Sequence, residues 1–92
     1  MAKSKIITYD LRKAGRNYDE LYKYLRSYTN LIAITESVWC VSTTKTCSEI
    51  RNELCAITDS NDGIFVGELN GTAAWHNIIG NSDLLKKTLQ GN

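Results

Sequence analysis

The residue types that most often carry out catalysis are few in this chain of 92 residues, and they form no catalytic pattern. His76 is the sole histidine, so no Ser/His/Asp or Cys/His arrangement can be assembled around a placed base. This argues against nucleophilic hydrolase chemistry. Cys40, Cys47 and Cys55 lack the spacing of a zinc site and cannot all pair within one monomer. We therefore expect reduced cysteines.

Two groups of charged residues remain as candidates for chemistry. The run Asp59-Ser-Asn-Asp-Gly63 brings two carboxylates close together, but this composition first of all indicates a turn, and the other ligands of a calcium loop are missing. Asp10 is followed by Arg12 and Arg16, which places two guanidinium groups near a carboxylate. By residue type alone, the simpler interpretation makes Asp10 a turn residue that accepts a loop amide, and the arginines solvated loop charges.

Charge is distributed unevenly along a chain whose formal net charge is only +1. Residues 1–30 contain seven basic and three acidic side chains, whereas residues 31–70 contain two basic and six acidic ones. This asymmetry allows one basic face, but a surface of mixed ion pairs explains it equally well. The near-neutral total argues against tight nonspecific binding of nucleic acid, which grows with the number of phosphates neutralised.

Size and composition indicate one globular domain over residues 1–92. Hydrophobic residues make up 42% of the chain and charged residues 23%, which is ordinary globular composition. The uncharged stretches are too short and too polar to span a bilayer, and the first five residues lead into a strand-like run rather than the apolar core of a signal peptide. We therefore expect a soluble cytoplasmic protein with no membrane partner.

The candidate residues lie on or between elements that the hydrophobic periodicity predicts. Runs of β-branched residues predict strands, and apolar residues three and four apart predict helices. Thr46 and Glu49 form a capping-box pattern, and Asn17 is available as the cap of the first helix. The predicted elements are a strand over 3–9 that ends at Asp10, a helix over about 18–28, strands over 31–35 and 37–43, a helix over about 47–57, and a strand over 64–69.

Two segments leave alternatives open. Residues 31–43 fit either a tight hairpin or one long bent strand, and we favour two strands with a turn or bulge at Glu36-Ser37. In the tail, leucines at helical spacing after Ser82 indicate a short terminal helix, whereas residues 72–79 fit a strand, a turn or a helix.

The element order βαββαβ is the split βαβ pattern of ferredoxin-like folds. We predict an α+β domain with a four-stranded antiparallel sheet and two helices on one face, a core over about residues 3–69, and a short C-terminal extension over 70–92. The other face of the sheet stays uncovered in such a fold and commonly binds a partner chain, nucleic acid or a ligand. If Tyr9 or Trp39 is exposed on that face, it could stack on a nucleotide or pack across a dimer.

Three segments in this order resemble one protein family. They are Ile6-Ile-Thr-Tyr-Asp-Leu11, Thr35-Glu-Ser-Val-Trp39 and Asn61-Asp-Gly-Ile-Phe-Val66. Together they are similar to CRISPR-associated protein 2 and its relatives, which show an aliphatic run ending in Tyr-Asp, a Ser-Val-Phe motif, and an Asp before the last core strand. The resemblance covers about residues 3–69. The whole chain looks closest to a branch of small stand-alone bacterial or mobile-element proteins, and VapD-like ribonuclease toxins belong to the wider superfamily.

The resemblance implies a homodimer and assigns roles to four residues. In the family, two copies of the aspartate that closes the first strand face each other across the dimer axis, and a divalent ion is proposed to bind between them. That residue is Asp10 here, and the implied ion is Mg²⁺ or Mn²⁺. Arg12 and Arg16 would neutralise or position the phosphate, and Ser37, which resembles the motif serine, would form hydrogen bonds near the same interface.

Three functions remain open on this basis. The first is a metal-dependent endonuclease, a phosphodiesterase acting on RNA or DNA, with Asp10, Arg12, Arg16 and Ser37 at its site. The second is a non-catalytic dimeric module that binds a protein or nucleic acid, because many members of the family act chiefly as structural dimers. The third is a toxin ribonuclease of the VapD kind. The C-terminal segment of the family often adds a strand to the partner's sheet, and residues 71–78 are not an obvious strand.

Overall fold

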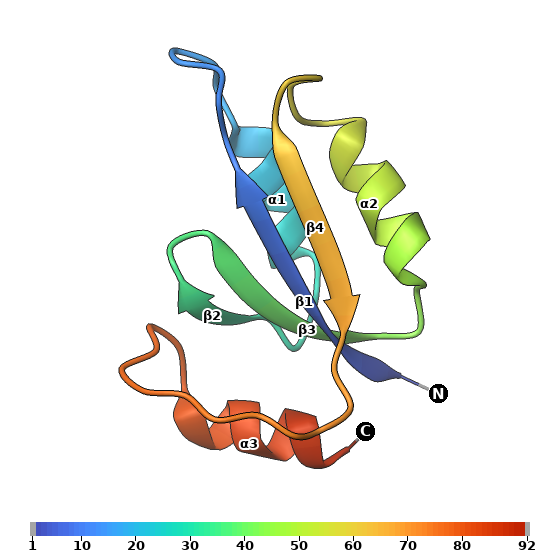
Figure 1. Ribbon diagram of the computed structural model, residues 1–92, viewed down its shortest axis with the longest axis vertical. Coiled ribbons are helices and arrows are strands. Elements are labelled where there is room, and N and C mark those ends of the chain that lie inside the picture. The colour runs from blue at the N-terminus through green and yellow to red at the C-terminus, as the bar shows by residue number, and fades with distance from the viewer. Residues whose placement is uncertain (1, 92) are drawn as a thin grey trace.

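A four-stranded antiparallel sheet and three helices make up the structure, a computed structural model that describes residues 2–91 (Figure 1). The sheet order is β2-β3-β1-β4, which confirms the predicted ferredoxin-like fold. The strands are β1 (Lys3–Asp10), β2 (Ile32–Thr35), β3 (Val38–Thr43) and β4 (Gly63–Glu68), and the helices are α1 (Asp19–Arg26), α2 (Cys47–Cys55) and α3 (Ser82–Gln90).

The register of the central strand determines where its last residues lie. β1 pairs with β3 from Lys3 opposite Thr43 to Thr8 opposite Val38, and with β4 up to Asp10 opposite Gly63. β1 therefore extends two residues beyond its pairing with β3, and Asp10 has a paired strand on the β4 side alone. The end of β1 is thus open on one side.

Helices α1 and α2 cover one face of the sheet, as predicted. The odd-numbered residues of β1 and β3 point to this face and meet the apolar side chains of the two helices. The buried residues of this core are Ile7, Tyr9, Leu21, Leu25, Val41, Ile50 and Leu54. At the start of α2, Thr46 and Glu49 form the predicted capping box.

Helix α3 covers part of the opposite face, so the expectation that this face stays bare is wrong for that part. Leu85 and Leu89 of α3 are 3% and 5% exposed and pack on Ile32 and Cys40 of the sheet. The helix forms as its leucine spacing predicted, but its N-cap is Asn81, whose side chain accepts a hydrogen bond from the backbone N–H of Leu84.

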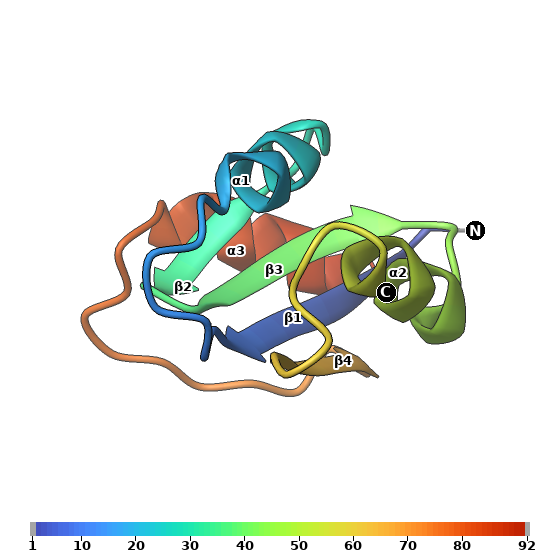
Figure 2. The same ribbon diagram turned by 90° about the horizontal axis from the view of Figure 1, so that it is seen from above.

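The segment between β4 and α3 forms neither strand nor helix in residues 69–81. Figure 2 shows it as a long loop that passes outside the sheet before it reaches α3. Its last residues attach to β2, because the backbone N–H groups of Ile79 and Gly80 donate to the carbonyls of Ile34 and Ala33. Within residues 2–91, no helix is long and apolar enough to cross a bilayer.

The hairpin between β2 and β3 has its turn at Glu36-Ser37, and the pairing shifts register between Ala33 and Thr35. This confirms two strands with a bulge rather than one bent strand. In the turn, the Ser37 carbonyl lies at the end of β1, where it accepts a 3.3 Å hydrogen bond from the backbone N–H of Tyr9.

Candidate functional site

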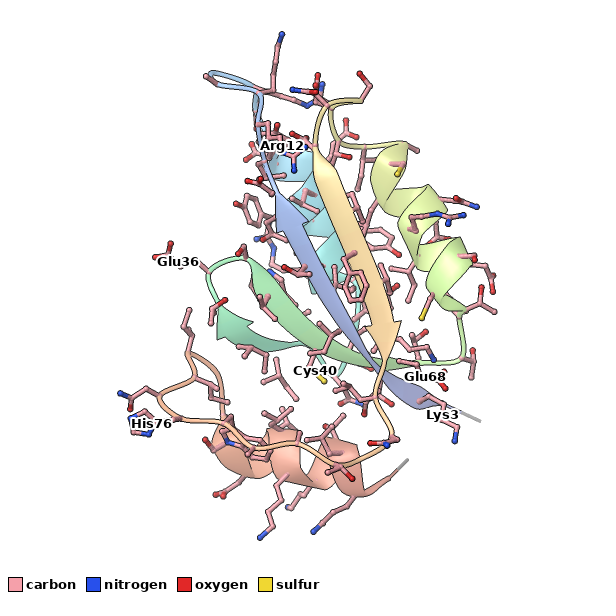
Figure 3. The ribbon with its side chains drawn as sticks, in the orientation of Figure 1. Lys3, Arg12, Glu36, Cys40, Glu68 and His76 are labelled. Atoms are coloured by element: carbon pink, nitrogen blue, oxygen red, sulfur yellow. The ribbon has the colours of Figure 1, made fainter. Side chains whose placement is uncertain are left out.

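Asp10 and Arg12 form an exposed ion pair at the open end of β1. The Nε atom of Arg12 donates to Oδ2 of Asp10 at 3.0 Å, and the side chains are 51% and 71% exposed, respectively. The guanidinium also donates from Nη1 to the carbonyl of Asn61 at 3.3 Å. Figure 3 shows Arg12 at the top of the sheet, where the loop after β1 meets the start of β4. The pair therefore faces solvent rather than the core.

Asp62 organises the two loops that carry this pair. Its Oδ1 accepts the backbone N–H of Arg12 at 2.7 Å and the hydroxyl of Tyr18 at 3.0 Å, and its Oδ2 accepts the backbone N–H of Asp59 at 2.8 Å. Burial raises the pKa of Asp62, but the hydrogen bonds from Arg12, Asp59 and Tyr18 together outweigh it and lower the pKa. The carboxylate thus ties the loop after β1 to the loop before β4.

This role confirms that the run from Asp59 to Gly63 is a turn, and it adds a contact that the sequence did not indicate. The run folds locally because the backbone N–H of Asp62 donates to the carbonyl of Asp59, and Oδ2 of Asp59 accepts the N–H of Asn61. The Asp62 bonds to Arg12 and Tyr18 join residues 50 and 44 positions apart, which no local pattern reveals.

Arg16 and Ser37 make contacts that do not include the ion pair. Arg16 Nη1 is 3.9 Å from Oδ1 of Asp59, and its guanidinium carbon lies 5.6 Å from the centre of the Tyr18 ring. Ser37 approaches the end of β1 through its backbone carbonyl, with its side chain half-buried. Of the four predicted site residues, the structure therefore joins Asp10 with Arg12 and holds Arg16 on a separate carboxylate.

A shallow hollow of about 290 Å³ opens beside Asp10, between the ends of β1 and β4. Phe65 forms one of its walls and is 63% exposed, on the part of the sheet face that α3 leaves uncovered. Sequence reasoning missed Phe65, although strand alternation places it opposite to Ile64 and Val66, both of which pack on the main core. The exposed ring of Phe65 therefore lies on the sheet face beside the charged pair.

Tyr9 and Trp39, whose exposure on the open face was the condition for stacking on a nucleotide, lie on the helix-covered face. Tyr9 is 7% exposed and belongs to the main core, against which Trp39 packs. The indole Nε1 of Trp39 donates to the Tyr9 hydroxyl at 2.9 Å, and that hydroxyl donates to the carbonyl of Glu36. Neither ring is therefore placed to stack on a nucleotide across the open face.

Within one chain, this site offers a divalent ion the carboxylate of Asp10, whose Oδ2 is already engaged. Mg²⁺ is usually bound through one or two carboxylates together with phosphate oxygens and water, whereas here one Asp10 oxygen already accepts Arg12. Both carboxylate oxygens of Asp62 already accept hydrogen bonds from the loop backbone. Within residues 2–91, no three His, Cys, Asp or Glu side chains gather as a possible metal site. A second carboxylate from another copy of the chain would change this balance.

The arrangement presents a cationic group at an exposed edge, where it can meet an anion. Arg12 presents a guanidinium that is half exposed and already oriented by Asp10 and Asn61, and guanidinium geometry matches phosphate.

Comparison of the chain with protein-family models, with curated proteins and with solved structures gave no match.

Proposed function

We propose that this protein is a homodimer related to CRISPR-associated protein 2 that acts as a metal-dependent endonuclease on RNA or DNA through Asp10. The observation that supports the proposal is the position of Asp10, which is 71% exposed at the open end of β1, beside Arg12 and a hollow walled by Phe65. The resemblance to CRISPR-associated protein 2 depends on the motifs around Asp10, Ser37 and Asp62.

The second subunit is what the proposed chemistry requires. Asp10 of each subunit would supply one carboxylate across the dimer axis, because a single chain offers only one. A divalent ion held there would polarise the phosphodiester and lower the pKa of an attacking water. Arg12 would turn from the carboxylate to a phosphate oxygen, a bidentate contact that a half-exposed guanidinium can reach.

A second candidate function, a non-catalytic dimeric module that binds a protein or nucleic acid, draws on the ion pair itself. Arg12 Nε lies 3.0 Å from Oδ2 of Asp10, and a cation on the carboxylate disfavours a second cation at the same oxygen. In this alternative, the exposed guanidinium of Arg12 contacts the partner, and binding needs neither metal nor Asp10.

The test compares wild type with Asp10→Ala and Asp10→Asn, and uses Asp83→Ala on α3 as the matched control. Cleavage of fluorescent single-stranded RNA and duplex DNA is measured with Mn²⁺, with Mg²⁺ and with EDTA. The endonuclease proposal expects metal-dependent cleavage that falls at least roughly 100-fold in both Asp10 variants and is unchanged in Asp83→Ala. Cleavage that persists in Asp10→Ala or in EDTA would refute it. No cleavage, with binding that survives Asp10→Ala, would favour the binding module.

The dimer has a test of its own, in which two equally exposed apolar residues are compared. Phe65 and Ile79 are each 63% exposed, but only Phe65 borders the Asp10 hollow. Phe65→Ser should shift the mass measured by sedimentation from dimer to monomer, whereas Ile79→Ser should leave the dimer intact. A wild-type protein that is monomeric at about 100 μM, or equal effects of the two variants, would contradict a dimer through this surface.

A further inference from the structure

A second cleft, of about 490 Å³, lies between α3 and the loop that leads into it. One wall is formed by Gly71 and the run from Ala73 to Trp75, and the other by Lys86, Leu89 and Gln90. In Figure 1, α3 and this loop occupy the lower end of the molecule, away from the loop after β1. The cleft is therefore separate from the Asp10 hollow, and its size is within the range of small-molecule sites.

A smaller apolar chamber adjoins the cleft. This chamber, of about 130 Å³, shares Ala73, Ala74, Trp75 and Leu89 with the outer cleft, and it reaches between α3 and the sheet. Its remaining lining side chains are Ile6, Ile34, Leu69 and Leu85. A chamber lined by aliphatic and indole groups gives a water molecule few hydrogen-bond partners. An apolar cavity of similar volume can instead bind a molecule of the size of benzene.

The loop that forms one wall is held at its two ends. Leu69 N–H donates to the carbonyl of Ser4 at one end, and Ile79 N–H donates to the carbonyl of Ile34 at the other. Between them, the described residues 70–78 form no backbone–backbone hydrogen bond, and Trp75 is held by a 3.3 Å bond from its Nε1 to Oγ of Ser82. Trp75 and Ile78 also pack against the buried residues under α3, so side-chain contacts hold this wall in place.

The charge at the cleft is positive. Lys86 is the one charged side chain among the cleft-lining residues, and it forms no ion pair with the described residues 2–91. Gln90, one helical turn further along α3, adds an amide that can donate or accept. A ligand that fills the chamber would thus meet a lone cation at its entrance.

We propose that this cleft binds a small amphiphilic carboxylate, with an apolar body of roughly six to eight carbons in the chamber and its carboxylate at Lys86. The apolar chamber accounts for the body, and the unpaired ammonium accounts for the anionic head. Ala73 and Ala74, which have small side chains, line both spaces. This site is independent of the Asp10 site and its function.

The test uses octanoate as the probe and the two tryptophan indole N–H signals in a ¹H–¹⁵N NMR spectrum as the readout. Trp75 lines the cleft, whereas Trp39 packs on the main core and serves as the internal control. Octanoate should shift the Trp75 signal in a saturable way and leave the Trp39 signal in place. Acetate, which lacks the body, and octanol, which lacks the charge, should each bind roughly tenfold more weakly or worse.

Three variants separate a built site from adventitious binding. Lys86→Met should weaken octanoate binding roughly tenfold, whereas Lys87→Met, on the next residue of α3, should not change it. Ala74→Leu should block the chamber and weaken octanoate binding at least as much. The Lys86 variant changes an exposed side chain and keeps the fold, so it remains informative even if Ala74→Leu unfolds. Equal loss in the two lysine variants, equal binding of octanol and octanoate, or an unchanged Trp75 signal would each overturn the proposal.

Discussion

The two ends of the molecule are held together by different kinds of interaction. At the Asp10 end, the Asp62 carboxylate joins two loops through three hydrogen bonds, and the neighbouring Asp10–Arg12 ion pair is exposed to solvent. At the α3 end, Leu85 and Leu89 are almost fully buried against the sheet. The first end should therefore respond to charge and pH, and the second to changes of side-chain volume. The predictions below test this difference.

The largest effect is expected from truncating the apolar contact of α3. Leu85→Ala should reduce the free energy of unfolding by about 2–4 kcal/mol, because it removes a buried apolar side chain and enlarges the space between α3 and the sheet. Leu84→Ala is the matched control: Leu84 is 39% exposed, and the loss should be less than about 1 kcal/mol. Urea denaturation measures both. Equal losses would show that α3 is not held by its buried face.

The reactivity of Cys40 shows whether Leu85→Ala loosens the contact between α3 and the sheet. Cys40 lies between the sheet and α3, as Figure 3 shows, and burial raises the pKa of its thiol to about 11. In a Cys47→Ser, Cys55→Ser background, Cys40 should react slowly with a thiol reagent at pH 8, because little thiolate is present and access is blocked. Leu85→Ala should accelerate the reaction.

Two glycines give the next largest difference. A Cβ at Gly80 would lie 2.9 Å from the carbonyl oxygen of Ala33 and 2.9 Å from Cγ2 of Ile32, so backbone must move. A Cβ at Gly63 would lie 3.0 Å from Nη2 of Arg12, the end of a flexible side chain. Gly80→Ala should cost about 1–3 kcal/mol of stability, and Gly63→Ala less than about 1 kcal/mol. The midpoints of urea denaturation measure the stability of both variants. A larger loss of stability in Gly63→Ala than in Gly80→Ala would contradict this prediction.

The pH dependence of stability should come in part from Asp62. Its folded pKa is lowered, so its contribution is complete above the unfolded value of about 3.9 and is lost as the pH falls through the lower folded value. Asp62→Asn removes this contribution. The variant should melt about 5 °C lower at pH 7, with a smaller further loss between pH 5 and pH 2 than wild type shows.

Thermal unfolding monitored by circular dichroism at several pH values checks this prediction. Glu36→Gln is the matched control, because Glu36 is exposed and only its backbone carbonyl is hydrogen-bonded. Its acid dependence should follow that of wild type. If Asp62→Asn loses as much stability in acid as wild type does, the loop contacts of Asp62 do not contribute to the pH dependence.

The smallest effect is expected at Asp10. Because its ion pair with Arg12 is exposed, Asp10→Ala should change the free energy of unfolding by less than about 1 kcal/mol. The change should decrease further in 1 M NaCl, which screens exposed charges. A loss above about 2 kcal/mol in urea denaturation would mean that Asp10 is a structural residue, and any loss of function in Asp10→Ala would then need another explanation.

Local patterns predicted most of the elements. The strand ending at Asp10, the turn at Glu36-Ser37 and the Thr46 capping box all depend on neighbours within a few residues, and all are confirmed. The leucine spacing predicted α3 itself. Periodicity did not show where α3 would pack, because an amphipathic helix only requires some apolar surface, and the sheet has two faces.

The candidate site was predictable only in part. Asp10 and Arg12 are two positions apart at the end of a strand, so their proximity follows from the sequence. The bonds of Asp62 to Arg12 and Tyr18 depend on loops brought together by the fold. Arg16 was expected beside the phosphate, but a separate carboxylate, Asp59, lies within reach of it. Such choices between nearby partners are decided by loop geometry.

The covered edge of β2 limits how this sheet can grow. Ile79 and Gly80 donate to the β2 carbonyls at 3.1 Å and 2.7 Å, and they occupy the side to which another chain would add a strand. Within residues 2–91, β4 is the strand left at an edge with no segment paired to its outer side. A sheet with two free edges can polymerise into a fibre, whereas one free edge can join two copies and then stops. The loop before α3 therefore blocks strand addition at the β2 edge and leaves the β4 edge as the one place where this sheet can be extended.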